Sequence, residues 1–349
     1  MYLDSTVNRR YTIAVDAMGG DDAPATIIAG LDLAYGELVA NQIDLLLFGK
    51  AEMLAPYLLK YPRLNSISKV IQAGEVVSPE DKPSKVIRSG RKTSMWMAIE
   101  SVRNKEADAI ISAGNTGCLM GISRLLLSML EGVRRPAITT QIPNEKGGFT
   151  VMLDLGANTE CDEHDILQFG IMGSVYAQII SGIARPRVGI LNIGSEVGKG
   201  FEYLNKAAEL NAVHRANLLY DYRGFVEGDD IFKCKVDVIA TDGFSGNVAL
   251  KTLEGTAKFI TGELKRVFKD SIIAKFGYLL MYNSLRYFRK KMDPRRYNGA
   301  VLLGLNGIVV KSHGGADALG FSSAVKYATK LVAGDFDTRV KMEMDKVEN

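Results

Sequence analysis

Residues 12–48 have the sequence TIAVDAMGGDDAPATIIAGLDLAYGELVANQIDLLLF. Two apolar runs, Thr12–Asp16 and Asp44–Phe48, flank the amphipathic stretch Ala25–Val39. An apolar run, a helical pattern and a second apolar run are typical of a βαβ unit. Because both runs are almost entirely apolar, we expect parallel strands that are covered on both faces.

The same alternation continues along most of the chain. Further strands are predicted at Ala109–Ser112, Thr150–Leu155, Val188–Ile193 and Val236–Ala240. Further helices are predicted at Gly117–Leu130, Asp165–Ile183, Glu202–Arg215 and Val248–Val267. This order favours an α/β fold with a doubly wound, mostly parallel sheet in three layers.

A hairpin is predicted near the end of the sequence. Asn306-Gly307 lies between the apolar runs Val301–Leu305 and Ile308–Lys311, and this dipeptide is a strong hairpin signal. We find no repeat, low-complexity tract or Ser/Pro-rich linker. Residues 1–349 are therefore predicted to form a single compact α/β unit, built as one body or as two lobes around a cleft.

Composition excludes several classes of protein. The 349 residues include 43 basic and 40 acidic side chains, and this net charge of +3 is too small for a general nucleic-acid binder. Three cysteines without CxxC spacing predict neither a disulfide framework nor a thiolate metal site. The polar residues 1–10 do not resemble a secretory signal, and no apolar run approaches the roughly 18 residues of a membrane span. We expect a cytoplasmic protein that is soluble or peripheral to a membrane.

Glycine, asparagine and aspartate gather after the predicted strands, where open α/β sheets bind ligands. Glycine lets the backbone approach a ligand closely, and helix N-termini present free N–H groups to anions. Five such loops predict a shared phosphate-binding cleft rather than independent turns. Neither a GxxxxGK nor a GxGxxG motif is present, so a nucleotide cofactor is not expected. The loops span residues 16–21, 112–117, 156–159, 192–196 and 241–247.

Four side chains are candidates for chemistry. His313 follows a predicted strand, where it either faces a cleft or fills a turn. Lys199 lies in a glycine-rich loop and is either a contact for phosphate or an oxyanion, or a solvated lysine. Asp242 and Asn247 flank the last glycine-rich turn, where they cap the following helix, cradle substrate, or do both. The histidines lack metal-ligand spacing, and no metal is expected.

These loops resemble those of the bacterial phosphate acyltransferases of phospholipid synthesis (the PlsX family). The resemblance extends from about Ile13 to Ala328. It rests on motifs that occur in the family's order: VDAMGGD at 15–21, SAGNTG at 112–117, GAN at 156–158 with Cys161, LNIG at 191–194 with Lys199-Gly200, TDGFSGN at 241–247, and residues 302–307 leading to His313-Gly314.

The resemblance implies that acyl-ACP and inorganic phosphate give acyl phosphate and free acyl carrier protein (ACP), a step that feeds glycerol-3-phosphate acylation. It implies a fold similar to phosphotransacetylases and isocitrate/isopropylmalate dehydrogenases, no cofactor, a homodimer, and contact with the membrane and with a membrane glycerol-3-phosphate acyltransferase. The catalytic group would be Lys199, Asp242, Asn247 and His313, with the last relaying a proton. The substrate-binding residues would be Asp16, Gly19, Gly20, Asp21, Gly114, Asn115, Thr116, Asn158, Asn192, Gly243, Ser245 and Gly246.

A basic segment extends over residues 265–296. It holds ten basic and two acidic residues, a net charge of +8, whereas the whole chain carries +3. Apolar residues interleave with the cations at roughly helical spacing, which predicts a projecting amphipathic helical hairpin. Such a hairpin can lie on anionic lipid, receive an acidic partner such as acyl carrier protein, or form the core of a dimer with a solvated basic face.

Three other functions were weighed against this one. A phosphotransacetylase acting on a short acyl-CoA is the nearest alternative, because its acceptor chemistry is the same. A decarboxylating dehydrogenase on the related fold would need an aspartate cluster for a metal and a nicotinamide site, and the sequence has neither. A membrane scaffold without activity would leave the glycine- and asparagine-rich loops unexplained.

Overall fold

The computed structural model describes residues 9–270, 272–283, 285–286, 295 and 299–348. Its strands form one eleven-stranded sheet in the order β3-β2-β1-β4-β11-β10-β5-β6-β9-β7-β8. Seven neighbouring pairs are parallel and three are antiparallel. The prediction of an α/β fold with a mostly parallel sheet is therefore confirmed.

The first part of the sheet is all parallel. It contains β1 (Tyr11–Asp16), β2 (Ile43–Gly49), β3 (Ser68–Gln72) and β4 (Ala109–Ser112). Along β1, Ile13 and Val15 enter one core while Ala14 enters another, so the strand is buried on both faces. This burial explains why the run is apolar without alternation.

Three antiparallel pairings lie in the middle of the sheet. The predicted hairpin is confirmed as β10 (Ala300–Leu303) and β11 (Ile308–Lys311), which insert between β4 and β5 (Ala137–Pro143). β5 then pairs antiparallel with β6 (Phe149–Leu153). From β6 onward the strands run opposite to β1 and β4: they are β9 (Val238–Ala240), β7 (Arg187–Leu191) and β8 (Asp221–Val226).

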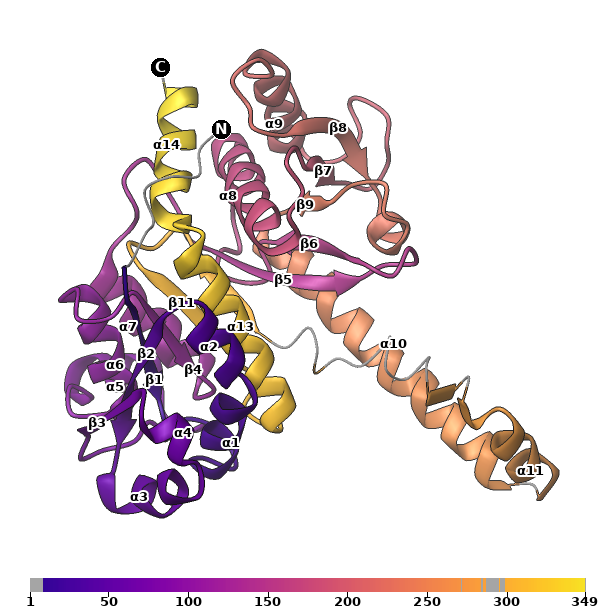
Figure 1. Ribbon diagram of the computed structural model, residues 1–349. Coiled ribbons are helices and arrows are strands. Elements are labelled where there is room, and N and C mark those ends of the chain that lie inside the picture. Colours follow the sequence, from indigo (N-terminus) through magenta and orange to yellow (C-terminus); the bar gives the residue numbers. More distant parts are fainter. Residues whose placement is uncertain (1–8, 271, 284, 287–294, 296–298, 349) are drawn as a thin grey trace.

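Helices cover both faces of the sheet, which gives the expected three layers (Figure 1). One face carries α1 (Ala25–Leu33), α2 (Tyr35–Ala40), α3 (Ala51–Lys60), α4 (Pro62–Asn65), α8 (Glu163–Ser181), α9 (Glu202–Val213), α13 (Ala318–Ala333) and α14 (Phe336–Glu348). The other face carries α5 (Pro83–Ser89), α6 (Ser94–Arg103) and α7 (Thr116–Leu127). A third core, under β5, β6 and β9, includes η1 (Gly228–Phe232) and the first turns of α10 (Gly243–Asp270).

α10 is the longest helix described, with 28 residues and a length of about 42 Å. Only its beginning packs on the sheet, and the rest projects from the body (Figure 1). At the far end α11 (Ile272–Leu280) folds against it, and the rings of Phe268 and Tyr278 meet edge to face at 5.3 Å. Part of the predicted basic hairpin, including Arg289, Lys290, Lys291 and Arg296, lies outside the described residues.

The predicted helices differ from the structure by a few residues at their ends, and two of them differ in a way that matters here. Residues 25–39 form two helices, α1 and α2, which meet at Ala34. The glycine-rich turn at 241–247 is not a turn throughout, because Gly243 already begins α10. The sequence predicts a turn before the helix for Gly243 and Gly246. In the structure both lie inside α10, where it packs closely against the loop that holds Asp154 and Asn158.

Candidate active site

The predicted site residues gather in two groups. The first surrounds Asp16, the last residue of β1, which is 1% exposed. Its carboxylate accepts hydrogen bonds from Ser94 Oγ at 2.6 Å and Ser112 Oγ at 2.7 Å. Burial raises the pKa of Asp16 although these hydrogen bonds oppose the rise. Asp16 therefore joins β1, α6 and β4 beneath the surface.

Three loops meet above Asp16. A Cβ at Gly19 would lie 2.4 Å from Asp16 Oδ2 and 2.8 Å from the Gly114 nitrogen, so only glycine allows this approach. Gly20 has φ +115°, and the next residue, Asp21, donates its backbone N–H to the Gly314 carbonyl at 3.0 Å. The loops at 16–21, 112–117 and 312–315 thus contact one another.

Asn115 and Thr116 stand at the start of α7. Asn115 is its N-cap, since its Oδ1 accepts from the Cys118 nitrogen at 3.0 Å. Its Nδ2 donates to the carbonyls of Pro79 and Asp81, so both ends of this amide are bonded within the protein. Thr116 is exposed at the first helical position.

Lys311 is a member of this group that the sequence analysis missed. It ends β11 directly before Ser312-His313, is 8% exposed, and places Nζ 3.5 Å from the Ala113 carbonyl. Burial lowers the pKa of Lys311 to about 8, although the carboxylates of Asp16 and Asp21 oppose this change. The sequence did contain a signal for Lys311, because a lysine that ends an otherwise apolar strand is unusual.

His313 itself is exposed, and its Nδ1 accepts from the Gly315 nitrogen at 3.1 Å.

The second group is built around Asp154, which directly follows β6 and is fully buried. Its carboxylate accepts backbone hydrogen bonds from residues 138, 156, 157 and 158, at 2.8–3.1 Å, and one from Asn158 Nδ2 at 2.9 Å. Burial raises the pKa of Asp154 although these bonds oppose the rise. Asn158 also donates to the Pro136 carbonyl at 2.6 Å, so its amide holds the loop.

α10 begins against this loop. Gly243 donates its N–H to the Asn158 carbonyl at 2.8 Å, and a Cβ at Gly246 would lie 1.9 Å from the Asp154 carbonyl oxygen. Asp242 accepts from the Ser245 nitrogen at 2.8 Å, which is the N-cap role that the sequence allowed. Its other oxygen accepts from Tyr203 Oη at 3.1 Å.

Asn247 and Lys199 are the exposed candidates of this group. Asn247 lies on the second turn of α10, next to Gly156, where a Cβ would be 3.5 Å from the Asn247 side chain. Lys199 is about half exposed, and its Nζ pairs with Glu196 at 2.8 Å. The Glu196 carboxylate raises the pKa of Lys199. Asn192 holds this loop by donating from Nδ2 to the Lys199 carbonyl at 3.0 Å.

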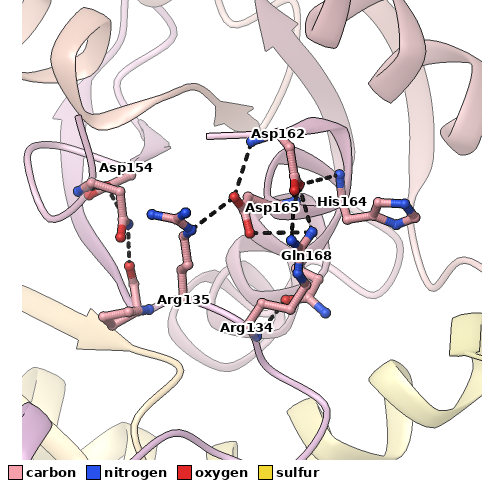
Figure 2. Close-up of polar contacts among 9 residues, drawn as sticks. Arg134, Arg135, Asp154, Asp162, His164, Asp165 and Gln168 are labelled. Carbon is pink, nitrogen blue, oxygen red and sulfur yellow. Dashed lines mark hydrogen bonds and ion pairs between the residues drawn. The ribbon is translucent and has the colours of Figure 1, made fainter. Parts of the chain in front are cut away.

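Two arginines beside this group were also missed (Figure 2). Arg134 donates two hydrogen bonds of 2.6 Å to Asp162, the N-cap of α8. Nε of Arg135 lies 3.1 Å from Oδ2 of Asp165, a carboxylate that is fully buried. No sequence pattern marked Arg135, because its partner lies thirty positions further along the chain.

The two groups follow strands of opposite direction. Asp16, Ser112 and Lys311 end β1, β4 and β11, whereas the second group follows β6, β7 and β9. One cleft lined by all five loops stays a prediction. Within the described part of the chain, no three His, Cys, Asp or Glu side chains gather as metal ligands would.

Comparison with known proteins identifies the family. The model of the fatty acid synthesis protein family matches residues 11–339. The chain belongs to this family. A phosphate acyltransferase of Paramagnetospirillum magneticum is 46% identical over 337 residues, which cover 97% of this chain and 95% of that protein. A phosphate acyltransferase of Paracoccus denitrificans is 47% identical over 329 residues, 94% of this chain and 88% of that protein. The resemblance seen in the loops is confirmed.

The fold of this fatty acid synthesis family member is also found in phosphotransacetylases. A phosphotransacetylase from Streptococcus pyogenes superposes with a TM-score of 0.60 at 15% identity, covering 93% of this chain and 94% of that one. A branched-chain phosphotransacylase from Enterococcus faecalis gives 0.54 at 12% identity, covering 92% and 99%. The identity to curated phosphate acyltransferases shows that the chain is an acyltransferase. Among its described helices, none combines the length and apolar character needed to cross a membrane.

Proposed function

We propose that the protein transfers an acyl group from the thioester of acyl carrier protein to inorganic phosphate. The products are acyl phosphate and the free carrier thiol, and the acyl phosphate then serves glycerol-3-phosphate acylation. The relatives named above are phosphate acyltransferases, which supports phosphate as acceptor. The observation that carries the proposal is the pair of partly exposed cations, Lys199 and Arg135, in the group where α10 begins.

The proposed chemistry needs no nucleophile from the protein. A phosphate oxygen attacks the thioester carbon, the C–O bond forms, the C–S bond breaks, and sulfur leaves as a thiolate. Such a reaction depends on positioning and on stabilising the negative charge that develops on the carbonyl oxygen. We assign that charge, or the phosphate, to Lys199. Asp242 and Asn247 order the site, the backbone of residues 114–116 cradles an anion, and His313 relays a proton.

We propose that acyl carrier protein and the membrane both bind to the projecting helices α10 and α11. On the outer half of α10, Lys265, Arg266 and Lys269 are exposed, and so are Phe259, Ile260 and Val267. Cations favour an acidic carrier protein and anionic lipid, while apolar side chains favour a lipid surface or a second copy of the chain. We propose a homodimer that contacts the cytoplasmic face of the membrane, where a glycerol-3-phosphate acyltransferase takes the product.

One assay tests the proposed reaction. Purified protein is incubated with long-chain acyl-ACP, with and without phosphate, and the free carrier thiol is measured with a thiol reagent. We expect thiol release that depends on phosphate. A parallel incubation with acetyl-CoA tests the short-chain alternative. Release that is independent of phosphate, or that occurs with acetyl-CoA alone, would overturn the proposal.

A further inference from the structure

Arg134 and Arg135 are adjacent in sequence but differ in how their guanidinium groups are used. Both terminal nitrogens of Arg134 donate hydrogen bonds to Asp162, each of 2.6 Å. The ion pair of Arg135 involves Nε, which lies 3.1 Å from Asp165 Oδ2. Within the part of the chain that the structure describes, the Arg135 guanidinium donates no hydrogen bond, and the side chain is 44% exposed.

The carboxylate that holds Arg135 is unusual in its burial. Asp165 is completely buried, and its Oδ2 also accepts from the Asp162 nitrogen at 3.1 Å. A buried carboxylate needs a cation, and Asp165 pairs with Arg135 Nε at 3.1 Å and, at the longer distance of 3.7 Å, with Arg134 Nη1. The ion pair keeps the guanidinium beside Asp165, and its terminal nitrogens, which donate no hydrogen bond within the described residues, remain able to bind a second anion.

Arg135 also lies next to the residues that hold the start of α10. The following residue, Pro136, accepts through its carbonyl from Asn158 Nδ2 at 2.6 Å, and the Asn158 carbonyl accepts from the Gly243 nitrogen at 2.8 Å. Figure 2 shows the Arg135 side chain between Asp154 and Asp165. The Arg135 guanidinium therefore lies beside the second group of site residues, which is built around Asp154.

We propose that Arg135 binds the acceptor phosphate through its terminal nitrogens, with Asp165 holding the guanidinium in place. This inference rests on the proposed function, since it names the side chain that recognises the acceptor. Two parallel N–H groups match two phosphate oxygens, which a lysine at this position does not reproduce. Arg134, whose terminal nitrogens are occupied, provides a matched control one residue away.

The test measures phosphate binding without any acyl donor. Radioactive inorganic phosphate is dialysed to equilibrium against the full-length protein and three variants: Arg135→Gln, Arg135→Lys and Arg134→Gln. We expect about 10- to 100-fold weaker binding in Arg135→Gln and an intermediate loss in Arg135→Lys, while Arg134→Gln stays within about twofold of the unmodified protein. Arg135→Lys keeps a cation beside the buried Asp165, so this variant should stay folded. A loss of phosphate binding in it can then be assigned to the missing pair of guanidinium N–H groups.

Kinetics with acyl-ACP then distinguish this inference from the proposed function. Arg135→Gln should raise the KM for phosphate and leave the KM for acyl-ACP unchanged. Phosphate binding by Arg135→Gln or Arg135→Lys that equals the unmodified protein overturns the inference while the proposed reaction stands. A rise only in the KM for acyl-ACP places Arg135 at the donor and overturns it too. If the unmodified protein neither binds phosphate nor releases thiol in response to it, both proposals are wrong.

Discussion

Several side chains that the sequence analysis proposed as site residues form hydrogen bonds within the protein. The amides of Asn115, Asn158 and Asn192 bond to backbone groups of neighbouring loops, and Asp242 caps α10. These residues fix the geometry of the loops, and the exposed cations are the groups that we propose to bind the ligand. The residues most suited to bind an anion are therefore those with the fewest internal bonds.

Replacing Lys199 with alanine should reduce turnover strongly and leave the fold intact. The side chain is about half exposed and pairs only with exposed Glu196 among the described residues, so its removal costs the fold little. Loss of one contact to a developing oxyanion costs about 3–4 kcal/mol in comparable sites. Thiol release at saturating phosphate and urea denaturation measure the two effects.

Glu196→Gln serves as the control for this change. It removes the partner of Lys199 and keeps the cation, so turnover should stay close to that of the unmodified protein. Near-normal turnover of Lys199→Ala would exclude this lysine from the mechanism.

At the scale of elements, the site depends on how closely α10 approaches the loop after β6. Gly246→Ala should destabilise the protein by about 1–3 kcal/mol and reduce activity, because a Cβ there would lie 1.9 Å from the Asp154 carbonyl oxygen. Gly262→Ala, in the same helix, has open space around it and should stabilise by about 0.5–1 kcal/mol. Urea denaturation of both variants checks the difference in sign, and equal effects would contradict it.

A second element-scale prediction concerns the pair that joins β7 to β9. Asp237 accepts from Arg187 Nε at 3.0 Å and Nη2 at 2.8 Å. Burial alone would raise the pKa of Asp237, but the hydrogen bonds from Arg187 lower it below the ordinary value. A lowered pKa means that this stabilisation is present above about pH 4, the unfolded value, and is lost as the pH falls through the folded one.

Asp237→Asn should thus lower the free energy of unfolding by about 1.5–3 kcal/mol at pH 7, and by less below about pH 4. Urea denaturation at the two pH values measures this difference. Asp221→Asn, in the more exposed pair with Arg223 on β8, should change stability by less than about 1 kcal/mol. A deficit of equal size at both pH values would show that Asp237 acts through packing and not through charge.

At the scale of the molecule, the reversal of strand direction decides how the two groups can meet. An antiparallel step places the following loops at the other edge of the sheet. Five pairings separate β4 from β9, and a twist of about 20–25° per pairing rotates them by roughly 100–125°. Twist of this size would reduce the angle between the two edges, and the joint action of both groups in one reaction stays a prediction.

The projecting helices give a further whole-molecule prediction. Leu279→Asp with Leu280→Asp should weaken binding to anionic vesicles, because both leucines are exposed on α11 and each contributes roughly 1.5–3 kcal/mol at full burial. Charge reversal at Arg289, Lys290 and Lys291, which lie outside the described residues, should weaken it by about 1 kcal/mol per cation near the surface. Vesicle co-sedimentation measures both changes.

Size-exclusion chromatography of the same variants separates membrane contact from dimerisation. Each variant should keep the elution volume of the unmodified protein and its phosphate-dependent thiol release. Unchanged co-sedimentation, with the leucine variant eluting as a smaller species, would show that these helices join two copies and do not bind lipid.

The sequence predicted the parallel strands because burial on both faces leaves them apolar, and it located the loops because glycine and asparagine mark strand ends. It missed three strands that contain several polar residues: β3 (SKVIQ), β5 (AITTQIP, with three polar residues in succession) and β8 (DYRGFV). The ion pair of Arg135 with Asp165 and the burial of Lys311 depend on partners distant in sequence. Local patterns carry no information about such pairs.

The position of the hairpin β10–β11 also determines how the chain can be made. β11 fills the space between β4 and β10, so residues 109–112 acquire their second neighbour only when residues 308–311 are present. During synthesis the N-terminal strands therefore leave the ribosome with one edge of β4 unpaired. An exposed strand edge invites pairing with other chains, so we expect a nascent chain stalled before residue 300 to bind chaperones and to be prone to aggregation.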